Sequence, residues 1–357
     1  MKCALPFRGI ATTPLGTFAP CCQIPFLHTF KGSFTEYWES DYLKNIQNKL
    51  LHNEWPSVCM KCKQIEETGS SSLRQDVGLT LDENQKYFDI RFNNLCNQAC
   101  LMCSSSFSSK IFDECNSVEN TMEHYTLLRN FTLSNYTELD INNLLNSIET
   151  GSRIEIAGGE PSIQKPVILL LTELIKKGLN KTITFRCLSN FNVLNKNFLE
   201  LVSNFKGQII ASIDDIGKRL EYIRFGSDWN RIQDNLFVFK EKCKDINIKI
   251  QPAIGAYNIL TLNQLIKWCN DNDFDISLNN YINYPKYFDC RILPQIVKDT
   301  ASLVLRNSNN TTKLIKFMNS KETDYRMIDS MKKQLKVNDK NRHICFNDTF
   351  PELCKLI

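Results

Sequence analysis

Apolar residues fall into six short runs that have the pattern of buried strands, at residues 88–92, 153–157, 182–188, 208–214, 246–250 and 274–278. Between them lie stretches with helical spacing, at about 119–149, 168–177, 195–205, 228–244 and 262–269. This alternation is typical of βαβ units, because parallel strands need a crossover connection. With right-handed crossovers, it predicts an α/β fold, a partial (β/α)6 TIM-like barrel over residues 86–290.

The segments on either side of this barrel have different patterns. Residues 1–85 form a small cysteine-rich unit with a turn at Pro14–Phe18, a helix over 37–51 and a polar linker at 68–72. Residues 291–357 form a C-terminal helical extension with helices at about 294–306 and 312–336. We expect the extension to pack on the flank of the barrel or to close its open side.

Composition places the chain among ordinary globular proteins. Of its 357 residues 42% are hydrophobic and 23% are charged, and the net charge of +4 is too weak to favour nucleic-acid binding. No apolar run is long enough for a signal peptide or a membrane span, so we expect a cytoplasmic protein.

Fifteen cysteines without an export signal favour metal or redox chemistry over disulfides. Cys96, Cys100 and Cys103 form a C-x3-C-x2-C loop directly after the first barrel strand. Three thiolates on one loop can hold three irons of a cubane cluster and leave the fourth iron open to another ligand. The alternatives for this triplet are a zinc half-site, or a chance spacing in a cysteine-rich chain.

This loop after a first strand resembles the radical S-adenosylmethionine (SAM) superfamily. The resemblance implies a [4Fe-4S] cluster whose open iron binds SAM, cleaves it reductively and yields a 5′-deoxyadenosyl radical that takes hydrogen from a substrate. The residue before the third cysteine is usually aromatic in that family; here it is Met102, whose adaptable side chain can lie against the adenine.

Further motifs at strand ends extend the resemblance. Gly158-Gly159-Glu160-Pro161 matches the GGEP motif, implied to accept hydrogen bonds from the SAM ammonium group. The resemblance also implies that Ser189 and Asn190 bind the ribose hydroxyls and that Ser212 forms a hydrogen bond near SAM. Asp214 is implied to shape the loop of Ser212, and Arg224 to pair with the SAM carboxylate. Arg219 is the competing candidate for the carboxylate, and residues 251–254 are candidates for lining the adenine.

The N-terminal cysteines resemble a second site. The spacing from Cys3 to Cys21 is C-x12-G-x4-C, and Cys59 and Cys62 follow as C-x2-C. This arrangement is similar to the twitch and SPASM auxiliary-cluster domains, which more often follow the barrel. The resemblance implies an auxiliary [4Fe-4S] cluster held by these four; a four-cysteine zinc site is the alternative. Because neighbours in an extended segment point opposite ways, only one of Cys21 and Cys22 should ligate, and the glycine spacing favours Cys21.

The substrate is not specified by these motifs. The resemblance favours a peptide or protein, with a nucleoside or carbohydrate as a second enzyme reading, and implies a reducing partner such as flavodoxin or ferredoxin. A non-catalytic zinc-binding interaction protein is the rival from another class. No catalytic acid or base is evident, because the four histidines (His28, His52, His124, His343) lie outside the strand ends. Tyr281, Tyr284 and Asp289 follow the sixth strand and have two alternative roles, contact with substrate or packing.

Overall fold

The computed structural model describes residues 3–67, 71–80, 82, 84–117, 136, 138–308 and 310–357. The helix expected over 119–149 falls within these residues only at 136 and from 138 onward, where α7 (Glu138–Ser147) forms. His124 and residues 68–70 of the expected linker lie outside the described residues.

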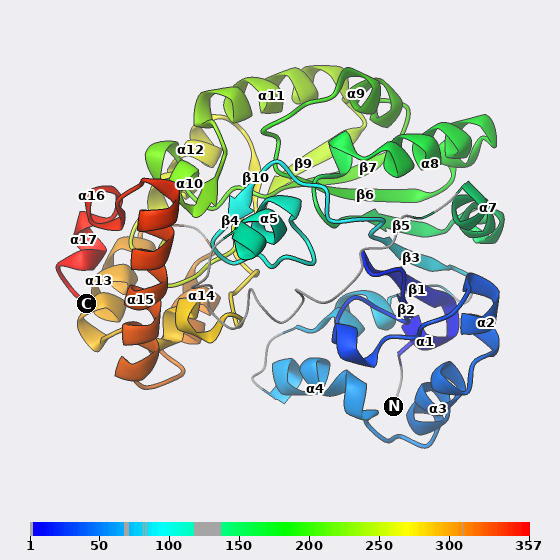
Figure 1. Cartoon of the computed structure of the whole chain (residues 1–357), viewed down its shortest axis with the longest axis horizontal. Helices are drawn as coiled ribbons and strands as arrows, with labels where there is room; N and C mark the ends of the chain where they lie inside the picture. Colours follow the sequence, from blue (N-terminus) through cyan, green and yellow to red (C-terminus); the bar gives the residue numbers. More distant parts are fainter. Residues whose placement is uncertain are drawn as a thin grey trace.

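An eight-stranded sheet, in the order β10-β9-β7-β6-β5-β3-β1-β2, runs through the protein (Figure 1). Every pairing from β10 to β1 is parallel, and only β1–β2 is antiparallel. All six predicted barrel strands are present, which confirms the α/β partial-barrel prediction. The strands are β1 (Gly9–Thr12), β2 (Phe18–Ala19), β3 (Tyr87–Ile90), β5 (Arg153–Ile156), β6 (Thr184–Ser189), β7 (Gly207–Ala211), β9 (Ile246–Ile250) and β10 (Asp275–Ile276).

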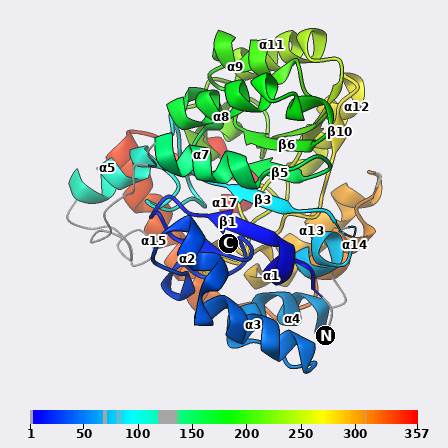
Figure 2. The same ribbon diagram turned by 90° about the vertical axis from the view of Figure 1, so that its right-hand side faces the viewer.

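One face of this sheet is apolar and is covered by the crossover helices, as Figure 2 shows for α7, α8, α9 and α11. Phe185 of β6 and Leu170 of α8 are fully buried in the same core. The barrel helices are α5 (Ser109–Ser117), α7, α8 (Lys165–Lys176), α9 (Lys196–Val202), α10 (Gly217–Ile223), α11 (Trp229–Lys242) and α12 (Leu262–Asp271). Side chains along a strand point alternately to the two faces of the sheet. Because the apolar residues of each strand point to the helix-covered face, the polar residues point to the other face.

The opposite face carries a row of charged side chains at positions that are in register on neighbouring strands. Asp89 pairs in register with Glu155, and Glu155 with Arg186. Arg186 Nη1 lies 2.5 Å from Glu155 Oε2, and Arg91 Nε lies 2.7 Å from Asp89 Oδ1. These pairings offset the cost of desolvating carboxylates inside the barrel.

The N-terminal segment shares the barrel sheet, because β1 is hydrogen-bonded in parallel to β3, which the sequence did not predict. The expected turn between β1 and β2 is present, with Gly16 at a φ of 71°. The helix expected over 37–51 is interrupted at Ser40, whose hydroxyl donates to Tyr37 O and accepts from Leu43 N. The helices here are α1 (Leu5–Arg8), α2 (Phe34–Glu39), α3 (Asp41–Leu51) and α4 (Met60–Glu67).

The C-terminal extension is helical, as predicted. Two separate helices, α14 and α15, form where one helix was expected over residues 312–336. Ser320 Oγ donates to Phe317 O at the end of α14, and Asp324 caps the start of α15 by accepting from Arg326 N and Met327 N. The helices are α13 (Gln295–Arg306), α14 (Thr312–Met318), α15 (Tyr325–Arg342), α16 (Phe346–Thr349) and α17 (Pro351–Cys354). Among the helices described, none has the length and apolar character that crossing a membrane requires.

Candidate functional site

The loop after β3 carries Cys96, Cys100 and Cys103, and a small two-stranded sheet holds it. Cys100 lies in β4 (Ala99–Cys100), which pairs with β8 (Arg224–Phe225). Burial, reinforced by the neighbouring Cys100 thiol, raises the pKa of Cys96 to about 12. Burial and the other two thiols also raise the pKa of Cys103. Burial therefore disfavours the thiolate forms of these cysteines, and a cation is needed to stabilise them as thiolates.

Within the part of the chain that is described, no three His, Cys, Asp or Glu side chains form a group that could hold a metal ion.

The GGEP segment lies directly against this cysteine loop. Glu160 N donates to Leu95 O at 2.8 Å, next to Cys96. Gly159 has a φ of 57°, and a Cβ at that position would overlap the Leu95 carbonyl oxygen. Gly158, at a φ of 81°, packs its backbone against Arg91. Both glycines are therefore needed for backbone conformation and for close approach.

Glu160 joins GGEP to the end of the next strand. Its carboxylate is 1% exposed, and it accepts from Ser189 Oγ at 2.8 Å and from Asn190 N at 2.7 Å. It also accepts from Ser162 N at 3.2 Å. Burial raises the pKa of Glu160, and these hydrogen bonds oppose the increase. A carboxylate has about four lone-pair positions, so Oε2 can accept one further bond from a ligand.

Asn190 and Ser212 lie at the ends of the neighbouring strands. Asn190 Nδ2 donates to Asn97 Oδ1 at 2.8 Å, which ties β6 to the cysteine loop. Ser212, half-buried, donates its backbone N–H to Ser189 O at 2.9 Å. Two amide nitrogens of the cysteine loop, Asn97 Nδ2 and Gln98 Nε2, are buried without a hydrogen-bond partner among the described residues. The sequence analysis did not single out either amide, and both suit an acceptor placed inside the loop.

Arg224 is held beside the cysteine loop. Its Nη1 lies 3.7 Å from Cys100 Sγ, and its Nε lies 2.8 Å from Asp214 Oδ2. Asp214 is buried and also accepts from Ala253 N at 2.7 Å, so it joins the ends of β7 and β9 to Arg224. Arg219 instead binds Gln264 and Glu352 away from the loop. Of the two arginines expected to compete for one role, the structure brings only Arg224 to the site.

Two predicted residues have mainly packing contacts. Met102, half-buried in the cysteine loop, packs against the main core, and Pro161 is buried at the start of a short 3-10 turn. Five cysteines outside these two groups are buried, namely Cys115, Cys187, Cys243, Cys269 and Cys290. Cys345 is exposed and Cys354 is half-buried.

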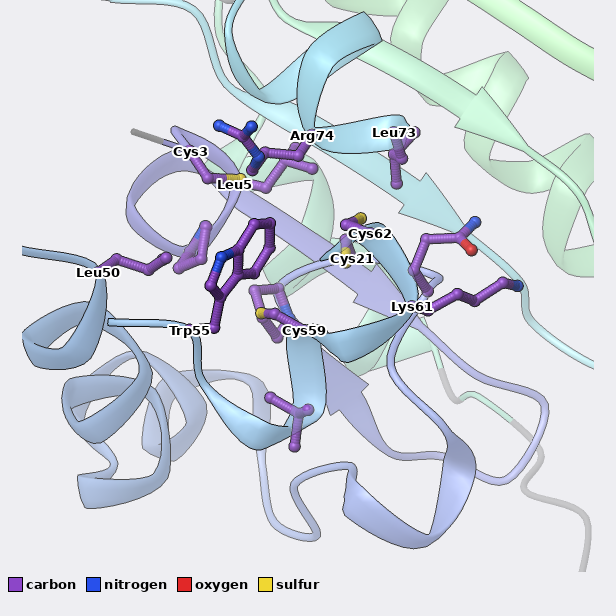
Figure 3. Close-up of a pocket in the computed structure, with 14 residues that line it drawn as sticks. Cys3, Leu5, Cys21, Leu50, Trp55, Cys59, Lys61, Cys62, Leu73 and Arg74 are labelled. Carbon is purple, nitrogen blue, oxygen red and sulfur yellow. The ribbon is translucent and has the colours of Figure 1, made fainter. Parts of the chain in front are cut away.

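The four N-terminal cysteines surround one pocket (Figure 3). Cys21 and Cys62 lie side by side, while Cys3 and Cys59 lie on either side of Trp55. Burial raises the pKa of Cys3 to about 11 and that of Cys59 to about 12. Cys3 and Cys21 lie on either side of β1 in the sequence, and Cys59 and Cys62 lie at the start of α4. The fold thus brings these thiols to one pocket, although 59 positions separate Cys3 from Cys62.

Two further residues support this pocket. Gly78 leaves room for Cys3, because a Cβ there would lie 2.7 Å from Cys3 Sγ. Arg74 lies over the Trp55 ring at 5.4 Å and donates to Glu66 Oε1 at 2.8 Å. Its positive charge favours the thiolate of Cys3. Sequence reasoning did not identify Gly78 or Arg74, because neither belongs to a spacing motif.

Cys22 points away from this pocket. Its thiol interacts with Asp89 and Arg91 of the inner barrel face, whereas Cys21 interacts with Cys59 and Cys62. The alternation that separates neighbours in extended backbone explains this difference.

Cys59→Ala and Cys22→Ala are a matched pair for testing this pocket as a metal site. If Cys3, Cys21, Cys59 and Cys62 hold a cubane, Cys59→Ala should lose about four irons per chain, while Cys22→Ala should lose none. Iron and acid-labile sulfide are counted after anaerobic purification. Loss of iron in Cys22→Ala with full retention in Cys59→Ala would contradict the ligand set.

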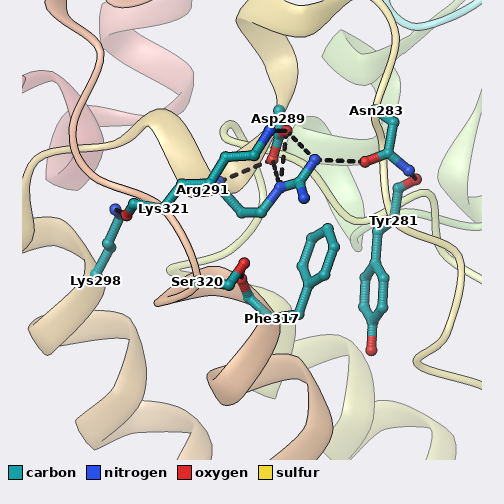
Figure 4. A network of polar contacts seen from close by, with 8 residues as sticks. All are labelled: Tyr281, Asn283, Asp289, Arg291, Lys298, Phe317, Ser320 and Lys321. Atoms are coloured by element: carbon teal, nitrogen blue, oxygen red, sulfur yellow. Dashed lines mark hydrogen bonds and ion pairs between the residues drawn. The ribbon is translucent and has the colours of Figure 1, made fainter. Parts of the chain in front are cut away.

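The residues after β10 form a separate network (Figure 4). Asp289 is 3% exposed, and its Oδ2 lies 2.6 Å from Arg291 Nη2 and 3.8 Å from Lys321 Nζ. The Arg291 guanidinium lies 4.4 Å from the Phe317 ring centre, and Phe317 stacks on Tyr281 at 4.0 Å. Tyr281 and Asp289 therefore join the barrel end to α14 through packing and ion pairs, and Tyr284 is exposed.

Several solved structures are similar to this chain at low sequence identity. A histidine-tagged anSMEcpe with bound AdoMet is 16% identical over 62% of this chain and 59% of that chain, with a TM-score of 0.43. Streptococcus suis SuiB bound to precursor peptide SuiA is 14% identical over 78% and 54% of the two chains, with a TM-score of 0.42. TYW1 with a lysine-pyruvate adduct bound is 15% identical over 61% and 72%, with a TM-score of 0.33.

The alignments thus cover less than two thirds of the length of anSMEcpe and of SuiB. No protein-family model matches the sequence, and no curated protein matches it. Among these similar structures, those of anSMEcpe and of Streptococcus suis SuiB contain bound AdoMet (S-adenosylmethionine).

Proposed function

We propose that this chain is a radical SAM enzyme whose cluster is held by Cys96, Cys100 and Cys103. The observation that carries the proposal is the direct contact of two motifs at least 55 positions apart, the cysteine loop and GGEP. The 2.8 Å bond from Glu160 N to Leu95 O joins them. An open metal position next to a glycine-lined strand end suits a chelating ligand.

The residues present fit a [4Fe-4S] cluster with SAM on its open iron. Three thiols supply three iron ligands, and the unpartnered amides of Asn97 and Gln98 supply buried donors close to the cluster position. When bound and reduced, such a cluster supplies the electron that splits SAM into methionine and a 5′-deoxyadenosyl radical.

The chain's own residues position the cosubstrate in this proposal. Glu160 Oε2 and the glycine backbone accept from the SAM ammonium group, and Ser189 and Asn190 hold the strand end that faces the ribose. Arg224, already paired with Asp214 and next to Cys100, shares its guanidinium donors with the SAM carboxylate. Met102, within the cysteine loop, and Ser212, hydrogen-bonded to Ser189, complete the proposed SAM site.

A metal count tests this proposal against its rival, a zinc-binding interaction protein. Anaerobically purified protein should contain about eight irons and about eight sulfides per chain if both sites hold cubanes. Zinc without sulfide would end the enzyme hypothesis. Addition of SAM should also change the electron paramagnetic resonance spectrum of the reduced protein, because SAM binds the open iron.

A peptide or protein is the substrate class we propose to test first, because the resemblance of the N-terminal cysteines to twitch and SPASM domains favours it. The solved structures of SuiB with precursor peptide SuiA and of anSMEcpe with Cp18Cys peptide are themselves complexes with peptides. Deuterated peptides, nucleosides and sugars are each incubated with reduced protein and SAM, and deuterium in 5′-deoxyadenosine is measured. Deuterium from a nucleoside or sugar, and none from peptides, would replace the peptide proposal with the second enzyme reading.

A further inference from the structure

The C-terminal end of α15 carries a buried arginine that contacts α5 and β8, the two elements next to the cysteine loop. Arg342 Nε donates to Glu114 Oε1 at 3.0 Å, and its Nη2 donates to Glu114 Oε2 at 2.8 Å. Its guanidinium carbon lies 5.0 Å from the centre of the Phe225 ring. A residue near the end of the chain is therefore bound to α5, which follows the loop, and to β8, which pairs with the loop.

Phe225 connects Arg342 to the three cysteines. It pairs with Ala99 across β4 and β8, next to the pair of Cys100 and Arg224. Phe225 and Cys103 pack against the same small cluster, which includes Ala99. The Phe225 ring thus contacts the Arg342 guanidinium and belongs to the strand that pairs with the cysteine loop.

The end of α15 is fixed in place, so this cation has a defined position. Asp339 Oδ1 accepts from Tyr222 OH at 2.6 Å, and its Oδ2 accepts from Phe346 N at 3.0 Å. The Tyr222 ring packs on Phe346 and Phe350, each at 5.6 Å. These contacts anchor α15 and α16 on α10, directly before β8.

The ion pair of Arg342 and Glu114 is asymmetric in its exposure to water. The Arg342 side chain is 1% exposed, whereas that of Glu114 is 32% exposed. Water screens the charge of Glu114 more than that of Arg342, because the effective dielectric constant is higher at the surface. The positive charge of Arg342 is therefore the less screened charge of the pair.

We propose that Arg342 is a positioning residue that raises the reduction potential of the cluster held by Cys96, Cys100 and Cys103. This inference rests on the proposed function. Reduction transfers one electron from an external donor to the cluster and adds one negative charge to a buried site. A nearby cation stabilises that charge, and cluster potentials depend on such local charge and burial.

Two substitutions that break the same ion pair distinguish an electrostatic role from a structural one. Arg342→Gln removes the cation, so the midpoint potential should shift to a more negative value. Glu114→Gln removes the anion and keeps the cation, so the midpoint should shift to a more positive value. The potentials are measured by titration with dithionite, followed by electron paramagnetic resonance. Shifts of both variants in the same direction, or no shift in either, would overturn the proposal.

Two more variants complete the experiment. Arg342→Lys retains the charge and should remain close to the wild-type potential, even if Arg342→Gln fails to assemble a cluster; a potential as negative as that of a neutral variant would contradict the proposal. Arg326→Gln removes an exposed arginine from the other end of α15 and should shift nothing. Absence of a [4Fe-4S] signal in the wild-type protein would instead refute the proposed function, which separates the two failures.

Discussion

Replacing Cys100 with alanine is expected to remove SAM cleavage and about four irons per chain. Cys100 is the cysteine of the loop that lies in β4, next to Arg224. Loss of groups that merely orient metal ligands typically lowers affinity or activity 10–100-fold, so loss of a ligand itself should lower cleavage by at least ~100-fold. The measurements are iron content and the rate of 5′-deoxyadenosine formation under dithionite.

Cys115→Ala is the matched control, because Cys115 is a buried cysteine packed beside Ala99 in the same region. It should keep its iron and its cleavage rate while losing about 1 kcal/mol of stability, as a small deletion in a packed core does. Equal loss of iron in Cys115→Ala and Cys100→Ala would mean that packing, and not ligation, explains the effect.

Gly159→Ala is expected to destabilise the protein by about 2–4 kcal/mol and to abolish SAM binding. The residue has a φ of 57°, which costs a residue with a Cβ about 1–2 kcal/mol. The added Cβ would also overlap the Leu95 carbonyl oxygen and would lie 2.8 Å from Gln164 Nε2. Because the first neighbour is backbone next to Cys96, relief of the overlap must move the cysteine loop.

Gly178→Ala isolates the conformational part of this cost. Gly178 has a φ of 71°, but nothing lies within 4 Å of the position its Cβ would take. Urea unfolding should therefore show a loss of about 1 kcal/mol for Gly178→Ala, with SAM binding unchanged. If both alanine variants lost the same stability and both bound SAM, the close approach of GGEP to the loop would have no functional meaning.

The barrel strands were predictable because each is a local apolar run with its own periodicity. The pairing of β1 with β3 was not predictable, because β1 is four residues long and no local pattern specifies which strand it pairs with. The breaks at Ser40 and at Asn319–Asp324 were also missed. There, side-chain caps compete with helix continuation, and the apolar spacing remains helical across them.

The contact between the cysteine loop and GGEP follows from topology, because β3 and β5 are parallel neighbours and their carboxyl ends meet at one edge. By contrast, the partners of Arg224 and Arg342 are set by tertiary contacts. Asp214 lies ten residues before Arg224, and Glu114 lies 228 positions before Arg342. No motif spacing encodes such pairs, so the C-terminal extension gave no functional signal in the sequence.

Anaerobic incubation of the dithionite-reduced protein with SAM measures the central proposal most directly. The account predicts equal amounts of methionine and 5′-deoxyadenosine from the wild-type chain and neither product from Cys100→Ala. Recovery of SAM intact from wild-type protein that carries its full iron and sulfide would contradict it.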